Sequence, residues 1–418
     1  MDNHSTNTGM NNPARGKSAI SFILMFCVSL LSFAGPWPGS LPGIEIGSGL
    51  PTGYEPSGAL WHTQLEKLFT VWDNGMVSMM DYDGSNVTTW SVYGDLEGVC
   101  VSDPNSDFVY VGVERPDDGI QEFNVVTGQA TRFFNLAPWM QSVNANLGLE
   151  ALTFVPNTSS AEGGNFYAGL QETGTIYIFE LPIASSDTET TVTFIDSIHT
   201  GLPGISGLDY NTEYGLLYAL WRYLAQLRVM LLDGTIIVEW DVPGDSQEGV
   251  ALWQGLSPGQ AQIFVAEDNG EIWRYDFNSQ CSITVIGCGS VNLAPDPPGY
   301  YGTLDTLTAI PDTGYQFIQW SGDLTGSENP AVLLMDYDKD ITATFESMRI
   351  SEHTNNEPMD SHKHPGATIS NGPLTLPEGK NCKVFDIIGR VVNPSRVTRG
   401  IYFLEIDNKI VQKVIKAR

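Results

Sequence analysis

The sequence predicts an all-β protein whose largest part is a five-bladed β-propeller. One short motif occurs five times, and the equivalent small residues of successive copies lie 40, 53, 56 and 42 residues apart. Repeats of about 40 to 50 residues with strand-like content are typical of propellers, with one blade to each repeat. The 43 glycines and 24 prolines suit many short strands joined by turns. The copies cover residues 55–61, 96–101, 149–154, 205–210 and 247–252.

Each repeat is predicted to contain four strands, and the motif forms the first of them. The fifth repeat ends after its third strand, near Phe277, so the ring needs a strand from elsewhere to avoid an exposed edge. We expect residues 43–47, ahead of the first repeat, to pair beside residues 272–275. The two longer spacings leave room for a sixth blade.

The order of the motifs carries a family resemblance. The copies read Glu55-Pro-Ser-Gly, Asp95-Leu-Glu-Gly, Asn146-Leu-Gly-Leu-Glu150, Ile205-Ser-Gly-Leu and Gln247-Glu-Gly-Val-Ala. This succession, over about residues 50–278, resembles the SdiA-regulated family of bacterial propellers. It is also similar to the broader group of calcium-dependent phosphotriesterase-like and esterase-like phytase propellers. The resemblance implies a propeller domain over residues 35–278.

A second module follows at residues 279–347. Its string Pro311-Asp-Thr-Gly-Tyr-Gln-Phe-Ile-Gln-Trp-Ser-Gly322 closely resembles the divergent internalin-type B-repeat, a small β-grasp-like module of bacterial surface proteins. Its aromatic residues are expected in the module's core. Cys281 and Cys288 flank a strand that would hold them roughly 20 Å apart when extended, too far for a disulfide, although a bend would bring them together.

The N-terminal residues 1–34 read as a secretory signal peptide. Arg15 and Lys17 precede an apolar run at 20–33, which is short for a membrane span of about 20 residues. The alternative is an uncleaved anchor. No other apolar run is long enough to span a bilayer, so no transmembrane span is expected after signal cleavage.

The C-terminal residues 373–418 follow a polar linker at 348–372. They contain Val384-Phe-Asp-Ile-Ile-Gly-Arg390, then Gly400-Ile-Tyr-Phe403 and a basic chain end. These features resemble the C-terminal sorting domain of type IX secretion substrates. The resemblance implies a β-sandwich that engages the type IX secretion machinery, passage across the outer membrane, and release or surface attachment. The alternative is a plain β-sandwich ending.

Charge is concentrated in the predicted propeller. Residues 35–278 contain 6 Lys and Arg against 32 Asp and Glu, a net charge of −26. Such a domain would repel phosphates, which argues against nucleic acid as a partner. The same charge permits divalent cations, and it also keeps an exported protein soluble.

The repeated motif predicts a cluster of oxygen ligands at the central channel. The first strand of each blade lines that channel, so the motif glutamates converge near one end of the axis. Several hard oxygen ligands at one point suit calcium, which accepts 6–8 of them. The alternative is that each glutamate accepts backbone N–H bonds from the next blade and locks the ring. A second polar set follows the second strands, at Asp73, Glu114, Gln171 or Glu172, and Glu267, and Asn144 and Asn146 offer amide oxygens. From both sets, the predicted metal ligands are Glu55, Glu97, Asn146, Glu150, Glu248 and Glu267.

Two functions remain open at the level of sequence. The first is a secreted or cell-surface protein that binds calcium or a small ligand, such as a surface glycan, at the acidic channel. The second is a calcium-dependent esterase or phosphoesterase in which Glu150 or Glu248 is the general base for a calcium-bound water. The chain has no Gly-x-Ser-x-Gly elbow, and neither His62 nor His199 falls in a recurring motif position.

Overall fold

The computed structural model describes residues 34–257, 260–348, 367–370, 376, 382–386, 390–406 and 409–416. In these residues the regular structure consists of strands and two 3₁₀ helices, η1 (Gly47–Gly49) and η2 (Pro394–Arg396). No helix in this part of the chain is long and apolar enough to cross a membrane. The signal peptide expected at 1–34 and most of the linker expected at 348–372 lie outside the described residues.

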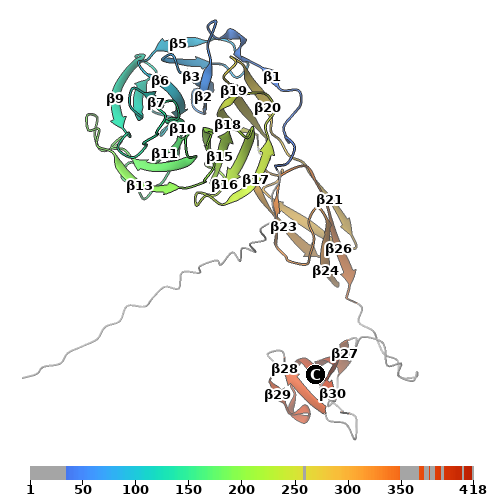
Figure 1. Ribbon diagram of the computed structural model, residues 1–418. Helices are drawn as coiled ribbons and strands as arrows, with labels where there is room; N and C mark the ends of the chain where they lie inside the picture. Colours follow the sequence, from blue (N-terminus) through green and yellow to red (C-terminus); the bar gives the residue numbers. More distant parts are fainter. Residues whose placement is uncertain are drawn as a thin grey trace, which may run out of the picture. The chain divides into compact units, whose positions relative to one another are not determined.

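Five four-stranded antiparallel sheets form a ring, which confirms the all-β, propeller-like fold (Figure 1). Numbered along the chain, the sheets have these strands. Sheet 1 is β2 (Pro56–His62), β3 (Lys67–Trp72), β4 (Met76–Met80) and β5 (Thr88–Ser91). Sheet 2 is β6 (Asp95–Cys100), β7 (Phe108–Arg115), β8 (Gly119–Asn124) and β9 (Gln129–Asn135). Sheet 3 is β10 (Leu149–Pro156), β11 (Gly164–Leu170), β12 (Thr175–Glu180) and β13 (Thr193–Ile198). Sheet 4 is β14 (Ile205–Asn211), β15 (Leu216–Trp221), β16 (Gln226–Met230) and β17 (Ile236–Asp241). Sheet 5 is β18 (Gln247–Ser257), β19 (Gln260–Glu267), β20 (Ile272–Asp276) and β1 (Ile44–Glu45).

The ring closes through its first and last strands. β1 pairs antiparallel to β20, with Ile44 opposite Arg274 and Glu45 opposite Trp273, as the sequence predicts. The inner strands β2, β6, β10, β14 and β18 contact one another in an unbroken cycle, in which β18 returns to β2. The edge that β20 would otherwise expose is therefore covered.

The hydrophobic core of the ring lies between neighbouring sheets, where a separate cluster of buried side chains fills each junction. At the axis, the backbones of neighbouring inner strands come too close for side chains. A Cβ on Gly58 would lie 2.4 Å from the Glu97 carbonyl oxygen, and one on Gly249 would lie 2.8 Å from the Ala59 nitrogen. Glycine is therefore required at these motif positions by close packing.

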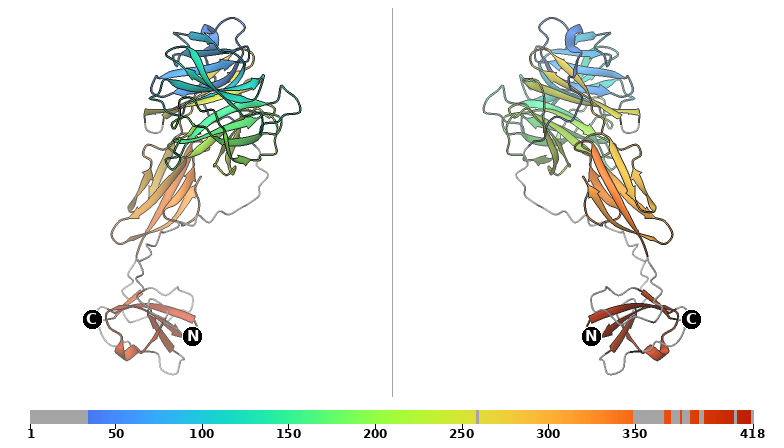
Figure 2. Two further views of the ribbon diagram at one scale, coloured as in Figure 1. Left: turned by 90° about the vertical axis from the view of Figure 1, so that its left-hand side faces the viewer. Right: turned by 90° about the vertical axis from the view of Figure 1, so that its right-hand side faces the viewer.

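The module that follows the ring has two three-stranded sheets, which share one core (Figure 2). One sheet has the order β21 (Cys281–Ile286), β26 (Lys339–Ser347), β24 (Tyr315–Gly322). The other has the order β22 (Gly289–Ala294), β23 (Leu304–Pro311), β25 (Ala331–Leu334). Trp320 is buried in the core, and Tyr315 and Phe317 pack against it, as the sequence predicts. Cys281 and Cys288 are not joined by a disulfide.

Tyr300 and Tyr301, in the loop before β23, belong to the same buried cluster as sheets 4 and 5. The Asn211 amide donates to the Tyr300 hydroxyl, and the Tyr218 hydroxyl donates to the Tyr301 carbonyl at 3.0 Å. The Trp240 indole N–H donates to the Asp336 carbonyl at 3.2 Å. The module thus contributes side chains to the core of the ring.

The described C-terminal residues form one five-stranded sheet in the order β27 (Ala367–Ser370), β31 (Lys409–Lys416), β30 (Gly400–Ile406), β28 (Cys382–Asp386), β29 (Val391–Val392). β27 lies inside the segment expected to be linker. The Arg390 backbone N–H and guanidinium Nε donate to the Asp386 carboxylate at 2.9 and 2.7 Å. The expected second sheet of a sandwich stays a prediction.

We expect Gly249→Ala to lower the free energy of unfolding by about 1–3 kcal/mol, because the added methyl group must displace the backbone of β2. Gly35→Ala is the matched control, since its Cβ would meet the Trp240 ring at an ordinary 3.4 Å. Urea denaturation of both variants measures the difference. Equal midpoints for the two variants would contradict the packing account.

Candidate functional site

A β-bulge recurs at the start of the inner strands and sets the direction of the motif side chains. In sheet 3, Leu149 pairs with Leu170 and Ala151 with Gly169, so Glu150 has no partner on β11. The same one-residue irregularity occurs in sheets 1, 4 and 5. In sheet 2 the pairing skips two residues, Glu97 and Gly98. Because a bulge interrupts the alternation of side chains, it can redirect one of them toward the axis.

The residues at these bulges are Ser57, Glu97, Glu150, Ser206 and Glu248. All five are at most 8% exposed. Glu97, Glu150 and Ser206 line an axial cavity of about 10 Å³, whose other walls are mostly motif glycines and their neighbours. A cavity of this size has room for about one water molecule or a single ion.

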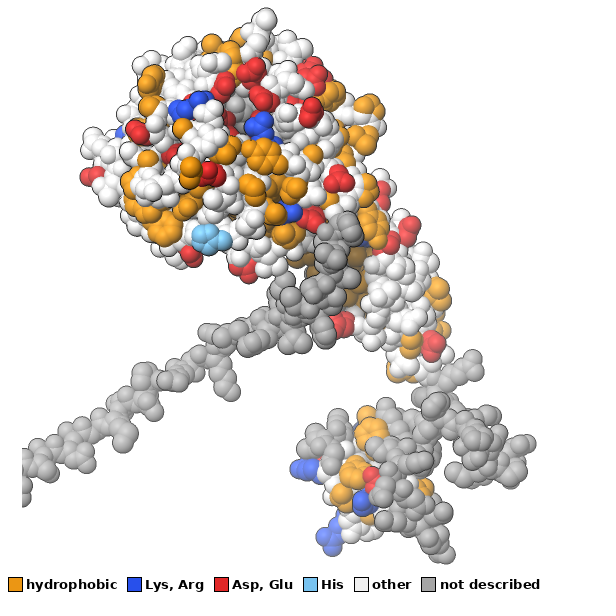
Figure 3. Space-filling view, viewed as in Figure 1, with side chains coloured by type: hydrophobic (Ala, Val, Ile, Leu, Met, Phe, Trp, Pro, Cys, Tyr) orange, Lys and Arg blue, Asp and Glu red, His pale blue; other side chains and the backbone are white. Residues whose placement is uncertain are grey.

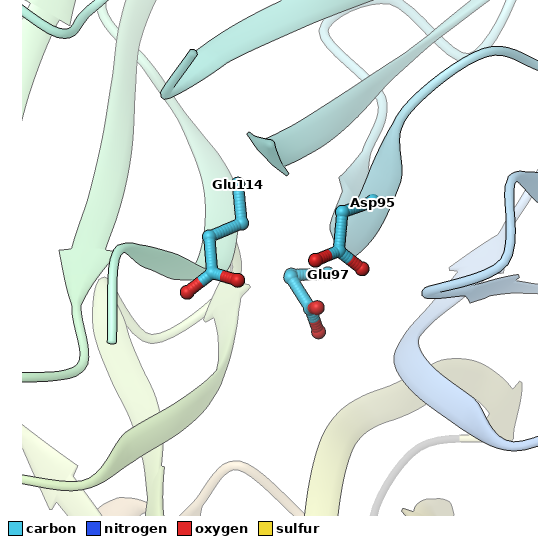
Figure 4. A group of neighbouring side chains, drawn as sticks. All are labelled: Asp95, Glu97 and Glu114. Atoms are coloured by element: carbon cyan, nitrogen blue, oxygen red, sulfur yellow. The ribbon is translucent and has the colours of Figure 1, made fainter. Parts of the chain in front are cut away.

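Three carboxylates meet beside this cavity: Asp95, Glu97 and Glu114 each offer an oxygen within 4.8 Å of the others (Figure 4). Asp95 and Glu97 come from β6, while Glu114 comes from a second irregularity, in which Asp95 pairs with Arg115 and Leu96 with Val113. All three side chains are buried. Arg115 pairs with one oxygen of Asp95, and the other oxygen, Oδ1, is buried without a hydrogen-bond partner.

Burial keeps several of these carboxyl groups protonated near neutral pH. Burial, reinforced by the neighbouring Glu150, raises the pKa of Glu97 well above its ordinary range. Burial raises the pKa of Glu150 to about 7, although hydrogen bonding from Glu97 and the charge of Arg222 oppose the shift. Burial also raises the pKa of Glu114 to about 8 against the opposing hydrogen bond from the Gly148 N–H. Charging all of them at once would place like charges together in a dry site.

The end of the central channel at which the motif glutamates lie is called its mouth. Sheet 4 supplies a positively charged side chain to this mouth, on the side opposite the three-carboxylate cluster. Arg222, which follows β15, pairs with Glu248 and lies 3.4 Å from Asp268. Burial, followed by repulsion from Glu150, raises the pKa of Glu248 to about 9, and Arg222 opposes the shift. The Glu248 Oε2 atom is buried without a hydrogen-bond partner. Each side of the mouth is thus partly neutralised by one arginine, Arg115 at sheet 2 and Arg222 at sheet 4, and the three-carboxylate cluster lies on the side of sheet 2.

The structure brings Glu97, Glu150 and Glu248 together at the axis, and it places the other predicted ligands elsewhere. Glu55 is exposed, and Ser57 occupies the bulge of sheet 1. Asn146 is exposed and accepts a hydrogen bond from Arg115 at 3.0 Å. Glu267 is 1% exposed and accepts from the Asp245 N–H at 3.3 Å and from the Asn269 amide at 2.9 Å.

Asp95 was not predicted as a ligand from the sequence. It stands two residues before Glu97 on one strand, a spacing that places both on one face, and that spacing could have indicated it. Glu114 was predicted only as a member of the polar set that follows the second strands, from which Glu267 was preferred as a ligand. In sheet 2 a pairing irregularity occurs at Glu114.

Several side chains form hydrogen bonds between neighbouring sheets. The Ser206 hydroxyl donates to the Gln247 carbonyl at 2.9 Å, and Asp209 accepts from the Leu252 N–H at 2.6 Å. Glu114 and Asp118 accept from the Gly148 and Leu149 N–H groups, both at 2.7 Å. The axial glutamates join sheets through side chains: Glu97 is hydrogen-bonded to Glu150, and Glu248 pairs with Arg222.

Large apolar side chains stand exposed on loops at the same edge of the sheets as the bulges. Tyr93 is 84% exposed between β5 and β6, Val143 is 97% exposed between β9 and β10, and Tyr223 is 57% exposed between β15 and β16. Figure 3 shows acidic, basic and apolar side chains mixed over the face of the ring that it presents. The acidic mouth therefore lies beneath a partly apolar rim.

Residues 280–349 match the family model of the divergent InlB B-repeat domain, which confirms the predicted B-repeat module. Among solved structures, the chain is similar to the crystal structure of Myxococcus xanthus glutaminyl cyclase, with 14% sequence identity and a TM-score of 0.39. That similarity covers 54% of this chain and 90% of the cyclase chain. No curated protein matches the chain. The resemblances to SdiA-regulated propellers and to type IX sorting domains stay predictions.

Without divalent cations, we expect the free energy of unfolding to fall as the pH rises from about 5 to about 9. The pKa values of about 7, 8 and 9 for Glu150, Glu114 and Glu248 exceed the ordinary value of 4.5, so the folded state binds more protons than the unfolded state in that window. The stabilisation is complete below pH 4.5 and is lost as pH rises through the folded pKa values. Thermal melts in chelator measure the trend.

Glu114→Gln should flatten this pH dependence, because the amide stays neutral throughout the range. Glu346→Gln, at an exposed position on β26, is the matched control and should leave it unchanged. A melting temperature that is flat or rises from pH 5 to pH 9 in the native chain would contradict the assignment of buried, protonated carboxyl groups.

Proposed function

We propose that this chain is an exported binding protein whose ring, a five-bladed propeller, holds a calcium ion at the mouth of its channel. The carrying observation is the cluster of three buried carboxyl groups, Asp95, Glu97 and Glu114, whose oxygens lie within 4.8 Å of one another. Arg115 pairs with Asp95 and Glu114 and balances part of their charge, so the remaining buried carboxyl groups must keep protons or bind a cation. Asp95, Glu97 and Glu114 are the proposed ligands, and Glu150 adjoins them.

The spacing of the cluster fits calcium. Two oxygens bound to one calcium at 2.3–2.6 Å can lie up to about 5 Å apart, and the three carboxylates offer oxygens within 4.8 Å of one another. The backbone N–H groups that are bonded between neighbouring sheets meet Glu114, Asp118 and Asp209 rather than Glu97 or Glu150, which leaves the oxygens of these two glutamates available to a cation. Both facts support a ligand-binding role for the axial glutamates.

Proton release is the second property of the proposed site. At neutral pH the cluster keeps protons because burial raises the pKa values of Glu97, Glu114 and Glu150. A bound divalent cation supplies the missing positive charge, so these groups ionise and release protons as it binds. Calcium affinity should therefore rise with pH.

We also propose a cellular setting for this site. The proposal includes export through the signal peptide at 1–34 and recognition of residues 373–418 by the type IX secretion machinery. The protein is then released or retained at the outer surface, where the B-repeat module is an adhesive or a spacer. The exposed Tyr93, Val143 and Tyr223 at the mouth suit contact with a further small molecule or surface glycan.

Calorimetric titration of the full chain with calcium should show binding accompanied by proton release, detected as a binding heat that depends on the buffer's ionisation enthalpy. Asp95→Asn and Glu97→Gln should each weaken binding roughly ten-fold or more, because each removes ligand charge. Asp268→Asn is the matched control on the Arg222 side and should bind normally. Absence of binding by the native chain, or equal affinity in all variants, would overturn the site.

A calcium-dependent esterase is the second candidate, because a carboxylate whose pKa is about 7 is suited to general-base catalysis at neutral pH. Glu150 meets this condition better than Glu248, which is paired with Arg222. Hydrolysis of 4-nitrophenyl acetate or phosphate that stops on chelation and in Glu150→Gln would establish the enzyme. Calcium binding without hydrolysis of either ester would leave the binding role alone.

A further inference from the structure

A second cavity, of about 300 Å³, lies between the outer strands of sheets 3 and 4, away from the acidic cluster. Sheet 3 contributes Ser197, Ile198 and the adjoining His199 to its wall. Sheet 4 contributes Trp221, Arg228 and Ile236. Its volume is at the lower end of the range typical of small-molecule pockets. None of these residues takes part in the proposed calcium site.

The polar group that marks this cavity is Arg228, which is only 8% exposed. Its guanidinium stacks over the Trp221 ring at 4.9 Å and lies 3.1 Å from the Glu239 carboxylate. The atom that lies 3.1 Å from Glu239 is Nε, in an ion pair that is not aligned as a hydrogen bond, and the terminal Nη2 atom donates to the Gln226 side chain at 3.2 Å. Among the described residues, Gln226 is therefore the one hydrogen-bond acceptor of this guanidinium, and a neutral oxygen in the cavity would add another.

A chemically similar pair elsewhere in the ring shows what completes such a site. Arg132 also pairs with a buried glutamate, Glu122, and also lies over an aromatic ring, that of Phe134, at 5.1 Å. Its guanidinium additionally donates to the carbonyl oxygens of Pro182 at 2.9 Å, Ser186 at 2.5 Å and Glu189 at 3.3 Å. Neutral backbone carbonyls from a loop therefore accept the remaining hydrogen bonds of the Arg132 guanidinium. In the described part of the chain, Arg228 has no such loop and lines the cavity instead.

We propose that the cavity between sheets 3 and 4 binds a small, uncharged carbonyl compound, such as an amide or an acyl group with an apolar body. Its carbonyl oxygen accepts from Arg228, as the loop carbonyls do at Arg132. Its apolar part packs against Trp221 and Ile236, while Ser197 and His199, which are hydrogen-bonded to each other at 3.2 Å, form a polar edge.

The charges around the cavity favour a neutral ligand over a carboxylate. Glu239 already balances Arg228, and Asp233 adds a further negative charge at the wall. A ligand carboxylate would meet this charge and lose free energy, whereas a neutral carbonyl would not. The proposal therefore predicts discrimination between two compounds that differ only in that group.

N-acetyl-leucinamide and N-acetyl-leucine are the two probes, titrated into the full chain and followed by ligand-observed NMR. The amide should bind, and the carboxylate should bind more weakly. Ile236→Trp, which fills the cavity from an exposed position, should weaken binding of the amide about ten-fold or more. Ile195→Trp, on exposed β13 outside the cavity, is the matched control and should bind as the native chain does.

Arg228→Gln should weaken binding of the amide to a similar extent. Its melting temperature shows whether this variant is folded. If it is unfolded, the binding of the amide to Ile236→Trp is the test of the proposal. No binding of the amide to the native chain, equal binding in Ile236→Trp and Ile195→Trp, or tighter binding of the carboxylate would each overturn the proposal. Loss of calcium binding in Asp95→Asn leaves this test unaffected, because the two sites share no residue.

Discussion

The crowding of five inner strands on one axis is the constraint on which the rest of the structure depends. Neighbouring backbones approach so closely that Cβ atoms on Gly58, Gly98 and Gly249 would collide with the next strand. Each of these strands has a β-bulge at the residue directly before the glycine. The side chain of that residue therefore departs from the usual alternation of side chains between the two faces of the sheet. Tight packing and the clustering of motif side chains therefore have one geometric origin.

This geometry creates an electrostatic problem. Glu97 and Glu150 are hydrogen-bonded to each other in a site with room for about one water or ion. The molecule balances the charge in two ways: protons stay on the buried carboxyl groups, and two arginines pair with them, Arg115 with Asp95 and Glu114, and Arg222 with Glu248. A calcium ion on the side of sheets 2 and 3 would be a third way, and it would compete with the protons.

Much of the fold could be predicted from the sequence because a backbone constraint recurs as a motif. The ring, the return of β1 to β20 and the B-repeat module follow from repeated or family-specific residues. Glu97, Glu150 and Glu248 were predicted at the axis for the same reason. Glu55 was placed there by its acidic type, whereas the bulge selects the residue directly before Gly58, which is Ser57.

The remaining features depend on contacts that occur once. Glu114 occupies a recurring acidic position after the second strand, but the pairing irregularity at this residue occurs in sheet 2 and not at the matching positions of the other described sheets. The cavity beside Arg228 depends on the way sheets 3 and 4 diverge at their outer strands. Single events of this kind leave no periodic trace in a sequence, so they are visible only once the strands are placed in space.

Infrared difference spectroscopy of the native chain, calcium-loaded minus chelated, at pH 7 tests the central claim most directly. Protonated carboxyl groups have a C=O stretch distinct from the bands of carboxylates. The account predicts that this band is present in chelator, decreases on addition of calcium, and is replaced by carboxylate bands. No protonated carboxyl band in chelator, or a band that calcium leaves unchanged, would contradict a site in which a cation replaces buried protons.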